Sequence, residues 1–162
     1  MPDEIRIRQA TAADGAAMWR LAGASGVLEL NSAYCYLLIA KHFGDTCMVA
    51  EGAKGVAGFV MAYRPPPTPA AVFVWQIGVA KAARGQGIAG RLLDAVAEST
   101  RAEYLEASVA TGNRASQALF RSFARRHGAP LDAAADFLNA DDFPGEHETE
   151  KLFRIGPLSF KG

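Results

Sequence analysis

The sequence predicts an α/β or α+β fold built around a mixed β-sheet. Two observations lead to this class. Stretches with helical spacing of apolar residues are interleaved with stretches that alternate or are continuously apolar, as strands are. In addition, a helix-like stretch separates two strand-like stretches between residues 71 and 109. A helix that joins two strands of one sheet forms a crossover, so we expect these two strands to be parallel.

The N-terminal part of the chain should form one strand and two helices. Ile5–Arg8 alternates in hydrophobicity as a short strand does. Thr11 and Asp14 carry oxygens that can cap a helix, and a stretch of helical spacing follows them. The glycine-containing segment 23–26 indicates a break. A second helix is expected after it, over about Ser32–Phe43.

The middle of the chain should supply three strands and a helix. Thr46–Ala50 and Val56–Tyr63 are typical of two strands joined by a glycine turn. The proline-rich segment 65–69 cannot lie inside a sheet and should be a stiff loop. Ala71–Val79 is almost continuously apolar, as a central strand covered on both faces would be. Apolar residues at every fourth position then predict a helix over about Gly87–Glu103.

The last third of the chain alternates again between the two kinds of element. Tyr104–Val109 predicts a strand, and Asn113–His127 predicts a helix with one apolar face. A weak strand is expected near Ala135–Leu138, followed by a polar loop over Asn139–Glu150. Lys151–Ile155 predicts the final strand.

Composition fits one globular domain and argues against several function classes. The 162 residues suit a single domain over 1–162 with a core of about 5–155. Seventeen basic residues balance seventeen acidic ones, so no nucleic acid or anionic membrane is expected as a partner. The most apolar stretch, 70–80, is too short to span a bilayer, and the N-terminus lacks a signal-peptide core. Two cysteines without a CxxC pair predict a reduced, cytoplasmic protein that binds no metal.

A strand, a short basic turn, two glycines and a helix start follow one another over residues 75–89. Glycines let a backbone approach a ligand closely, and free amides at a helix N-terminus attract anions. Arg84 adds a positive charge, so the segment suits a pyrophosphate. No Lys-Ser or Lys-Thr follows the glycines, which argues against a Walker A loop. A dinucleotide fingerprint on Gly85, Gly87 and Gly90, or a tight turn without a ligand, are the alternatives.

The amino-acid sequence of this turn resembles a family signature. Arg84-Gly85-Gln86-Gly87-Ile88-Ala89 resembles the Arg/Gln-x-x-Gly-x-Gly/Ala motif of the GNAT superfamily of N-acetyltransferases, and 113–120 resembles that family's second motif. The resemblance implies a GNAT fold, with a mixed central sheet flanked by helices, and acetyl-CoA as cosubstrate. Its pyrophosphate would bind the glycine turn, and its pantetheine arm would pair with the preceding strand. The residues expected to bind acetyl-CoA are Ile77, Val79, Arg84, Gly85, Gln86, Gly87, Ala89, Asn113 and Ser116.

One position departs from the family pattern. Many members have a tyrosine where Phe120 stands, and there it protonates the departing thiolate. Phenylalanine has no proton to donate. Either water or another group supplies the proton, or coenzyme A leaves as the thiolate, which a thiol pKa of about 8.5 permits. The departure also leaves open a catalytically silent coenzyme A-binding sensor.

Three further motifs resemble the diaminobutyrate acetyltransferases of ectoine biosynthesis, a family within this superfamily. They are Asn-Ser-x-Tyr-x-Tyr at 31–36, Phe-Val-Trp-Gln at 73–76 and His-Glu-x-Glu at 147–150. The resemblance covers roughly residues 5–155 and implies acetylation of the 4-amino group of L-2,4-diaminobutyrate. That family usually has aspartate where Glu29 stands, and glutamate keeps the charge. We also expect a homodimer.

The implied acceptor is a compact dication with one carboxylate. Its site needs carboxylates for the amines, a donor for the acid and a group that takes a proton from the reacting amine. The residues expected to bind it are Glu29, Asn31, Tyr34, Trp75 and Glu150, and those expected to act in catalysis are His147 and Glu148. All of them except Glu29 have a structural alternative: helix capping by Asn31, core packing of Tyr34 and Trp75, backbone capping by His147, and a solvated face for at least one of Glu148 and Glu150.

Two other functions remain as alternatives at this point. One is acetylation of a different amine, such as a polyamine or a protein N-terminus, and the other is the silent sensor. The loops at 139–150 and 65–69 look able to close over a small substrate, whereas a protein substrate would need an open groove.

Overall fold

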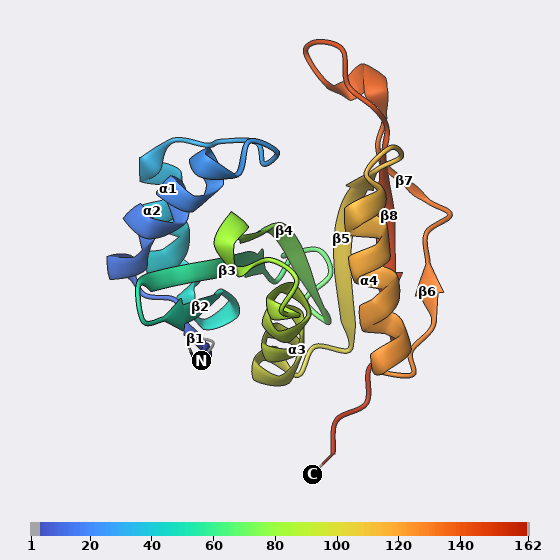
Figure 1. The fold of residues 1–162 in the computed structure, drawn as a ribbon. Coiled ribbons are helices and arrows are strands. Elements are labelled where there is room, and N and C mark those ends of the chain that lie inside the picture. Colours follow the sequence, from blue (N-terminus) through green and yellow to red (C-terminus); the bar gives the residue numbers. More distant parts are fainter. Residues whose placement is uncertain (1–3, 162) are drawn as a thin grey trace. The chain divides into compact units, whose positions relative to one another are not determined.

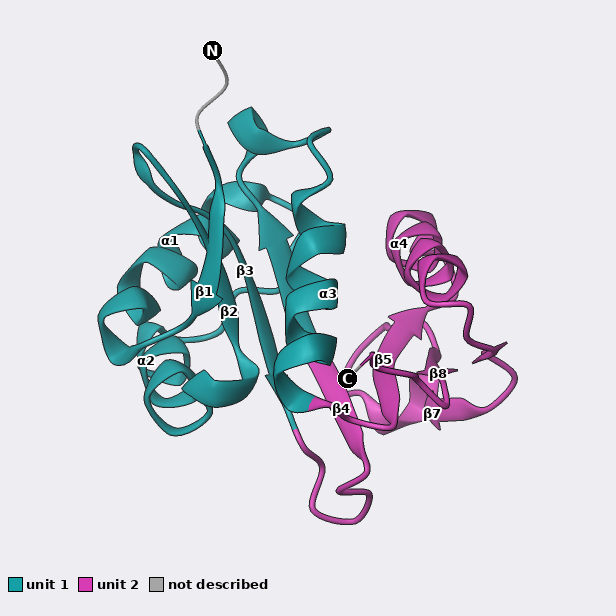
Figure 2. Ribbon diagram, turned by 90° about the horizontal axis from the view of Figure 1, so that it is seen from below, with its two compact units in different colours: residues 1–63, 75–100 teal, residues 64–74, 101–162 magenta. Residues whose placement is uncertain are grey.

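The computed structural model describes residues 4–161, which form two compact units (Figures 1 and 2). Unit 1 comprises the described residues up to 63 together with 75–100, and unit 2 comprises 64–74 together with the described residues from 101 onward. The strand β4 (Ala71–Val79) belongs to both, because its first part counts with unit 2 and the rest with unit 1. The single domain expected from the sequence stays a prediction.

Unit 1 combines a set of strands with three helices. Its other elements are β1 (Arg6–Gln9), α1 (Gly15–Ser25), α2 (Ala33–His42), β2 (Met48–Gly52), β3 (Gly55–Tyr63) and α3 (Ile88–Thr100). The strands follow the order β1-β2-β3-β4, and β2 is antiparallel to both of its neighbours. Figure 2 shows α1 and α2 on one face of these strands and α3 on the other. Met18, Tyr36, Phe59 and Met61 are fully buried between the first two helices and the strands.

The ends of the first two helices differ in detail from the sequence prediction. The break expected over 23–26 is wrong for its first residues, since α1 continues to Ser25. Gly23 stays helical because one glycine costs a helix only about 1 kcal/mol. The helix ends at Gly26, whose φ of +71° is left-handed and suits glycine. Ser32 caps α2 by accepting a hydrogen bond from the Cys35 backbone N–H at 3.2 Å.

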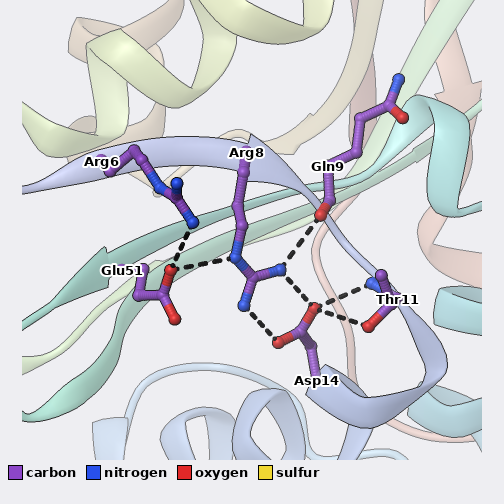
Figure 3. Close-up of polar contacts among 6 residues, drawn as sticks. All are labelled: Arg6, Arg8, Gln9, Thr11, Asp14 and Glu51. Carbon is purple, nitrogen blue, oxygen red and sulfur yellow. Dashed lines mark hydrogen bonds and ion pairs between the residues drawn. The ribbon is translucent and has the colours of Figure 1, made fainter.

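An ion-pair network ties β1 to β2 and to the start of α1 (Figure 3). The Arg8 guanidinium donates to both Asp14 carboxylate oxygens at 2.8 Å and, through Nε, to Glu51 at 3.1 Å. Arg6 also donates to Glu51, and the Thr11 backbone N–H donates to Asp14 at 2.8 Å. The Asp14 side chain is only 8% exposed. The hydrogen bonds from Arg8 outweigh the effect of burial and hold the pKa of Asp14 below its usual value.

Unit 2 packs one helix against the other strands. Its further elements are β5 (Tyr104–Ala110), α4 (Arg114–Arg126), β6 (Leu131–Asp132), β7 (Asp136–Leu138) and β8 (Glu150–Ile155). The strand order is β4-β5-β8-β6, and β7 also pairs with β8. Ala71–Val74 runs parallel to Tyr104–Ala107, which confirms the predicted crossover, while β8 is antiparallel to β5, which makes the sheet mixed. Across residues 4–161, no helix is both long and apolar enough to cross a membrane.

Candidate active site

The glycine-rich turn joins the end of β4 to the start of α3. A short 3-10 turn, Lys81–Ala83, follows the strand, and α3 begins at Ile88. Gly85 and Gly87 have φ values of +81° and +73°, which L-residues rarely adopt. The backbone N–H groups of residues 85–89 donate no hydrogen bond to any described residue. The turn therefore presents several free donors at a helix N-terminus, which is the arrangement that binds an anion.

Positive charge gathers at the end of β4, where this turn begins. The Arg84 side chain is exposed, and its Nε reaches the Val79 carbonyl oxygen at 3.4 Å, so the guanidinium is directed back along the turn. A pocket of about 480 Å³ adjoins Val79 and Lys81 and is also lined by Arg20 and Lys54. No described residue forms an ion pair with Arg20, Lys54 or Lys81. Unpaired cations of this kind attract a polyanionic ligand to this end of unit 1.

The strand before the turn alternates in exposure after residue 74. Trp75, Ile77 and Val79 are partly exposed, whereas Gln76 and Gly78 are buried. The two apolar side chains expected to flank the pantetheine arm, Ile77 and Val79, thus point to the same side of β4. Gln86 is exposed and Ala89 is half-buried. All the predicted coenzyme residues of unit 1 are thus at least partly exposed, and they lie close together in the sequence, between residues 77 and 89.

The acceptor residues expected in unit 1 come from the α1–α2 connection and from β4. Tyr34 is 68% exposed, so it does not pack in the core of unit 1 as one interpretation had it. Asn31 is half-buried, and the capping role belongs to Ser32. Glu29 is exposed. Trp75 is 42% exposed and lines an open apolar pocket of about 320 Å³, so its indole ring is not simply core.

Sequence reasoning missed a buried polar pair beneath these residues. Gln76 is 8% exposed and Tyr36 is fully buried. The Tyr36 hydroxyl donates to Gln76 Oε1 at 2.8 Å, and Gln76 Nε2 donates to the Glu29 backbone carbonyl at 2.7 Å. Both residues stand in the quoted motifs, as the last tyrosine of Asn-Ser-x-Tyr-x-Tyr and the glutamine of Phe-Val-Trp-Gln. The sequence signal that could have revealed this pair is Gln76, a glutamine within an otherwise apolar strand.

His147 lies on the loop before β8 in unit 2. Its ring stacks on Phe143, with centroids 3.6 Å apart and planes inclined by 9°. Its Nδ1 lies 2.6 Å from the Glu148 backbone carbonyl oxygen. Because a carbonyl can only accept, Nδ1 must carry the hydrogen, and in the neutral ring Nε2 then has a free lone pair. The contact with the Glu148 backbone is the structural alternative expected for His147, and it leaves Nε2 as the ring nitrogen without this partner.

Two glutamates near His147 differ in their surroundings. Glu148 is exposed and accepts a long hydrogen bond from the Thr111 hydroxyl at 3.4 Å. Glu150, the first residue of β8, is half-buried and accepts from the Ser108 hydroxyl of β5 at 3.1 Å. The structure thus brings both carboxylates against the end of β5 and the turn that follows it. Glu148 keeps most of its hydrogen-bonding capacity for another partner.

The remaining predicted residues lie at the start of α4 and within it. The Asn113 side chain caps α4 by accepting from the Ser116 backbone N–H at 3.1 Å, and both residues are at least partly exposed. Phe120 is 3% exposed and packs edge-on against Phe153, with centroids 6.4 Å apart. Its side chain is therefore a core element of unit 2. Among the described residues, no cluster of three or more His, Cys, Asp or Glu could hold a metal ion.

The chain is similar to known proteins over its whole described length. It matches the acetyltransferase (GNAT) family over residues 17–124. The L-2,4-diaminobutyric acid acetyltransferase of Streptomyces avermitilis is 44% identical, over 98% of this chain and 92% of its own length. That of Halomonas elongata is 40% identical, over 94% of this chain and 81% of its own. The structure of the diaminobutyrate acetyltransferase of Paenibacillus lautus, in complex with its substrate L-2,4-diaminobutyric acid and coenzyme A, has a TM-score of 0.90 at 37% identity, with 99% of both chains covered.

Proposed function

This chain belongs to the acetyltransferase (GNAT) family, and from that premise we propose that it acetylates L-2,4-diaminobutyrate at the 4-amino group with acetyl-CoA. The product is N4-acetyl-L-2,4-diaminobutyrate, and the reaction is a step of ectoine biosynthesis. The observation that carries the proposal is the full-length similarity to diaminobutyric acid acetyltransferases, at 44% identity over 98% of the chain. The free amides and unpaired cations around residues 79–89 support acetyl-CoA as the donor.

In the proposed reaction the neutral 4-amino nitrogen attacks the thioester carbonyl carbon of acetyl-CoA. The C–N bond forms, the C–S bond breaks, and coenzyme A leaves as the thiolate. An amine of pKa about 10 is neutral in only about one molecule in a thousand at pH 7, so the nitrogen must lose one proton before it attacks, and it loses a second as the amide forms. We assign the uptake of these two protons to His147 and Glu148, with Nε2 of His147 as the first acceptor because Nδ1 is occupied. Phe120 takes no part, since it is buried and has no proton to give.

The remaining roles follow from charge. The exposed carboxylate of Glu29 and the half-buried carboxylate of Glu150 are proposed to hold the ammonium groups of the acceptor, and Trp75 offers its half-exposed ring as a cation–π face. Tyr34 and Asn31 are proposed to donate to the α-carboxylate. On the donor side, Ile77 and Val79 flank the pantetheine arm, and the segment from Arg84 to Ala89 binds the pyrophosphate. Asn113 and Ser116 complete the coenzyme contacts.

The proposal is tested by following thiol release from acetyl-CoA with different amines. Diaminobutyrate should react, and NMR of the product should show the acetyl group on N4. Ornithine, which is one methylene longer, should react about 10–200 times more slowly if the pocket is snug. Faster reaction with a polyamine than with diaminobutyrate would mean that the acceptor is a different amine. Coenzyme A binding without any turnover would favour the silent sensor, which the missing tyrosine permits.

A matched pair of variants tests the carboxylates. Glu148→Gln removes the charge but keeps the shape of a side chain that we place at the acceptor, so the KM for diaminobutyrate should rise or kcat should fall. Glu146→Gln makes the same change two positions away in the same exposed loop and should have no effect. The KM for acetyl-CoA should stay near wild type in both. Equal kinetics of the two variants would remove Glu148 from the site.

We further propose that the protein works in the cytoplasm as a homodimer. The two cysteines, Cys35 and Cys47, are free thiols, which suits a reducing compartment. Light scattering coupled to gel filtration should give twice the chain mass of 17.2 kDa. A monomeric mass at micromolar concentration would contradict the dimer and leave the proposed reaction untouched.

A further inference from the structure

The segment that follows α1, Gly26–Asn31, is named here the acceptor loop, because it carries Glu29 and Asn31. Resting on the proposed function, we infer that Gln76 and Tyr36 are positioning residues. Together they fix the acceptor loop on β4 and thereby set where the Glu29 carboxylate stands. Neither side chain needs to touch a substrate for this role. The inference depends only on contacts within unit 1.

The orientation of the Gln76 amide is determined by its partners. The Glu29 backbone carbonyl can only accept, so the nitrogen of the amide must face it, at 2.7 Å. The amide oxygen must then face Tyr36, whose hydroxyl donates at 2.8 Å. Every member of this chain of hydrogen bonds has one permitted direction. Because Gln76 is 8% exposed and Tyr36 is fully buried, water cannot readily replace either bond.

Two further contacts hold the same loop. Ser25 is 7% exposed, donates to the Ala22 carbonyl at 2.7 Å, and accepts from the Leu28 backbone N–H at 3.0 Å. Gly78, two residues after Gln76 and on the same side of β4, leaves room for Leu28. A Cβ at Gly78 would lie 2.7 Å from the Leu28 side chain. The loop is therefore attached to β4 by one polar and one apolar contact.

This attachment has a consequence for selectivity. Gln76 lies on β4 between Trp75 and Ile77, and β4 is the strand proposed to flank the pantetheine arm of acetyl-CoA. The hydrogen bond to the Glu29 carbonyl thus fixes the acceptor loop relative to the strand that holds the donor. If Glu29 holds one amine of the substrate, the distance from its carboxylate to β4 sets how long a diamine must be for its other amine to reach the thioester. A loosened loop should bind diaminobutyrate more weakly and discriminate less against ornithine.

Three substitutions test the inference. Tyr36→Phe removes only the hydroxyl that orients the amide. Gln76→Glu keeps the acceptor for Tyr36 but replaces the nitrogen that bonds the Glu29 carbonyl. Thr46→Val is the matched control: Thr46 is 6% exposed, and its hydroxyl donates to the Ala62 carbonyl in the same unit, away from the acceptor loop. Each variant is compared for thermal unfolding, for hydrogen exchange of residues 26–31, and for KM and kcat with both substrates.

The expected result separates positioning from general stability. Tyr36→Phe and Gln76→Glu should raise the KM for diaminobutyrate about tenfold, equivalent to about 1.4 kcal/mol. They should also lower the preference for diaminobutyrate over ornithine and speed exchange in the acceptor loop. In both variants the KM for acetyl-CoA should remain within about twofold of wild type. Thr46→Val should lose a similar amount of thermal stability but keep the wild-type KM values, substrate preference and exchange rates.

Two results would overturn the inference. One is a folded Tyr36→Phe with wild-type KM for diaminobutyrate and wild-type exchange in the loop; this variant decides the matter if Gln76→Glu does not fold. The other is a parallel rise of both KM values, which would indicate a structural role alone. If the wild-type protein does not acetylate diaminobutyrate at all, the proposed function fails, while the exchange measurement still reports whether the pair holds the loop.

Discussion

The left-handed glycine at position 87 allows a sharp test of the coenzyme site. Gly87 has a φ of +73°, and a Cβ added there would meet no atom within 4 Å. Gly87→Ala therefore creates no clash and is strained only by its backbone conformation, at about 1–2 kcal/mol. The chain can keep that conformation and place a methyl group in the open space around the turn. Alternatively, it can relax to a negative φ and misalign the free amides of residues 85–89. Both responses should weaken an anion bound at the turn.

The size of the effect is set by comparison with a second glycine. Gly128, beyond the end of α4, has a φ of +58° and equally open surroundings, so Gly128→Ala should lose a similar free energy of unfolding. In calorimetric titrations with coenzyme A, Gly87→Ala should bind at least tenfold more weakly, equivalent to about 1.4 kcal/mol, whereas Gly128→Ala should bind as the wild type does. If Gly87→Ala loses as much stability as Gly128→Ala but keeps wild-type affinity, the pyrophosphate does not bind at this turn.

Other perturbations follow from the contacts of each unit. Arg8→Met leaves the mostly buried Asp14 carboxylate without its ion-pair partner, and it should lower the unfolding free energy by about 2 kcal/mol in urea titrations. Arg6→Met, at a side chain that is 72% exposed, should barely change the unfolding free energy. The lowered pKa of Asp14 contributes stability above its unfolded-state pKa of about 3.9, and this is lost as pH falls through the folded-state pKa. The difference in unfolding free energy between wild type and Arg8→Met should therefore become smaller below about pH 4. A difference that stays constant with pH would mean that the pKa of Asp14 does not contribute to stability in this way. Phe120→Leu should cost about 1–2 kcal/mol of stability and keep turnover. A loss beyond about a hundredfold, roughly 2.7 kcal/mol of barrier, would give Phe120 a catalytic role.

Most of the fold could be predicted from local patterns. The boundaries of β4 agree with its apolar run, Ala71–Val79. The expected cover on both faces is correct only for its first four residues, since Trp75, Ile77 and Val79 are partly exposed. The helix expected over Asn113–His127 was correct to within one residue at each end, since Asn113 is a capping side chain that the sequence itself displays. The two-residue strand β6 (Leu131–Asp132) was missed because so short a segment has no periodicity to read. It forms through pairing with β8, which is a tertiary contact.

The candidate site was only partly predictable, for a related reason. Residue types and motifs indicated the charged and aromatic groups, and the glycine turn has the left-handed geometry that such a motif requires. The hydrogen-bond partners of those groups depend on which elements meet in space. Gln76 and Glu29 are 47 positions apart, and nothing in either local sequence marks them as partners. The tautomer of His147 likewise depends on one backbone carbonyl at 2.6 Å.

The close approach of Glu148 to the turn after β5 has a consequence for substitutions at Gly112. A Cβ at Gly112 would lie 2.6 Å from a carboxylate oxygen of Glu148. That oxygen is the end of a flexible, exposed side chain, so Gly112→Ala should turn the carboxylate aside at little cost in stability. A methyl group at residue 112 can thus displace Glu148 without any change to residue 148 itself. Gly112→Ala should therefore raise the KM for diaminobutyrate as Glu148→Gln does, and wild-type kinetics of the variant would mean that this position of the Glu148 carboxylate does not matter for the acceptor.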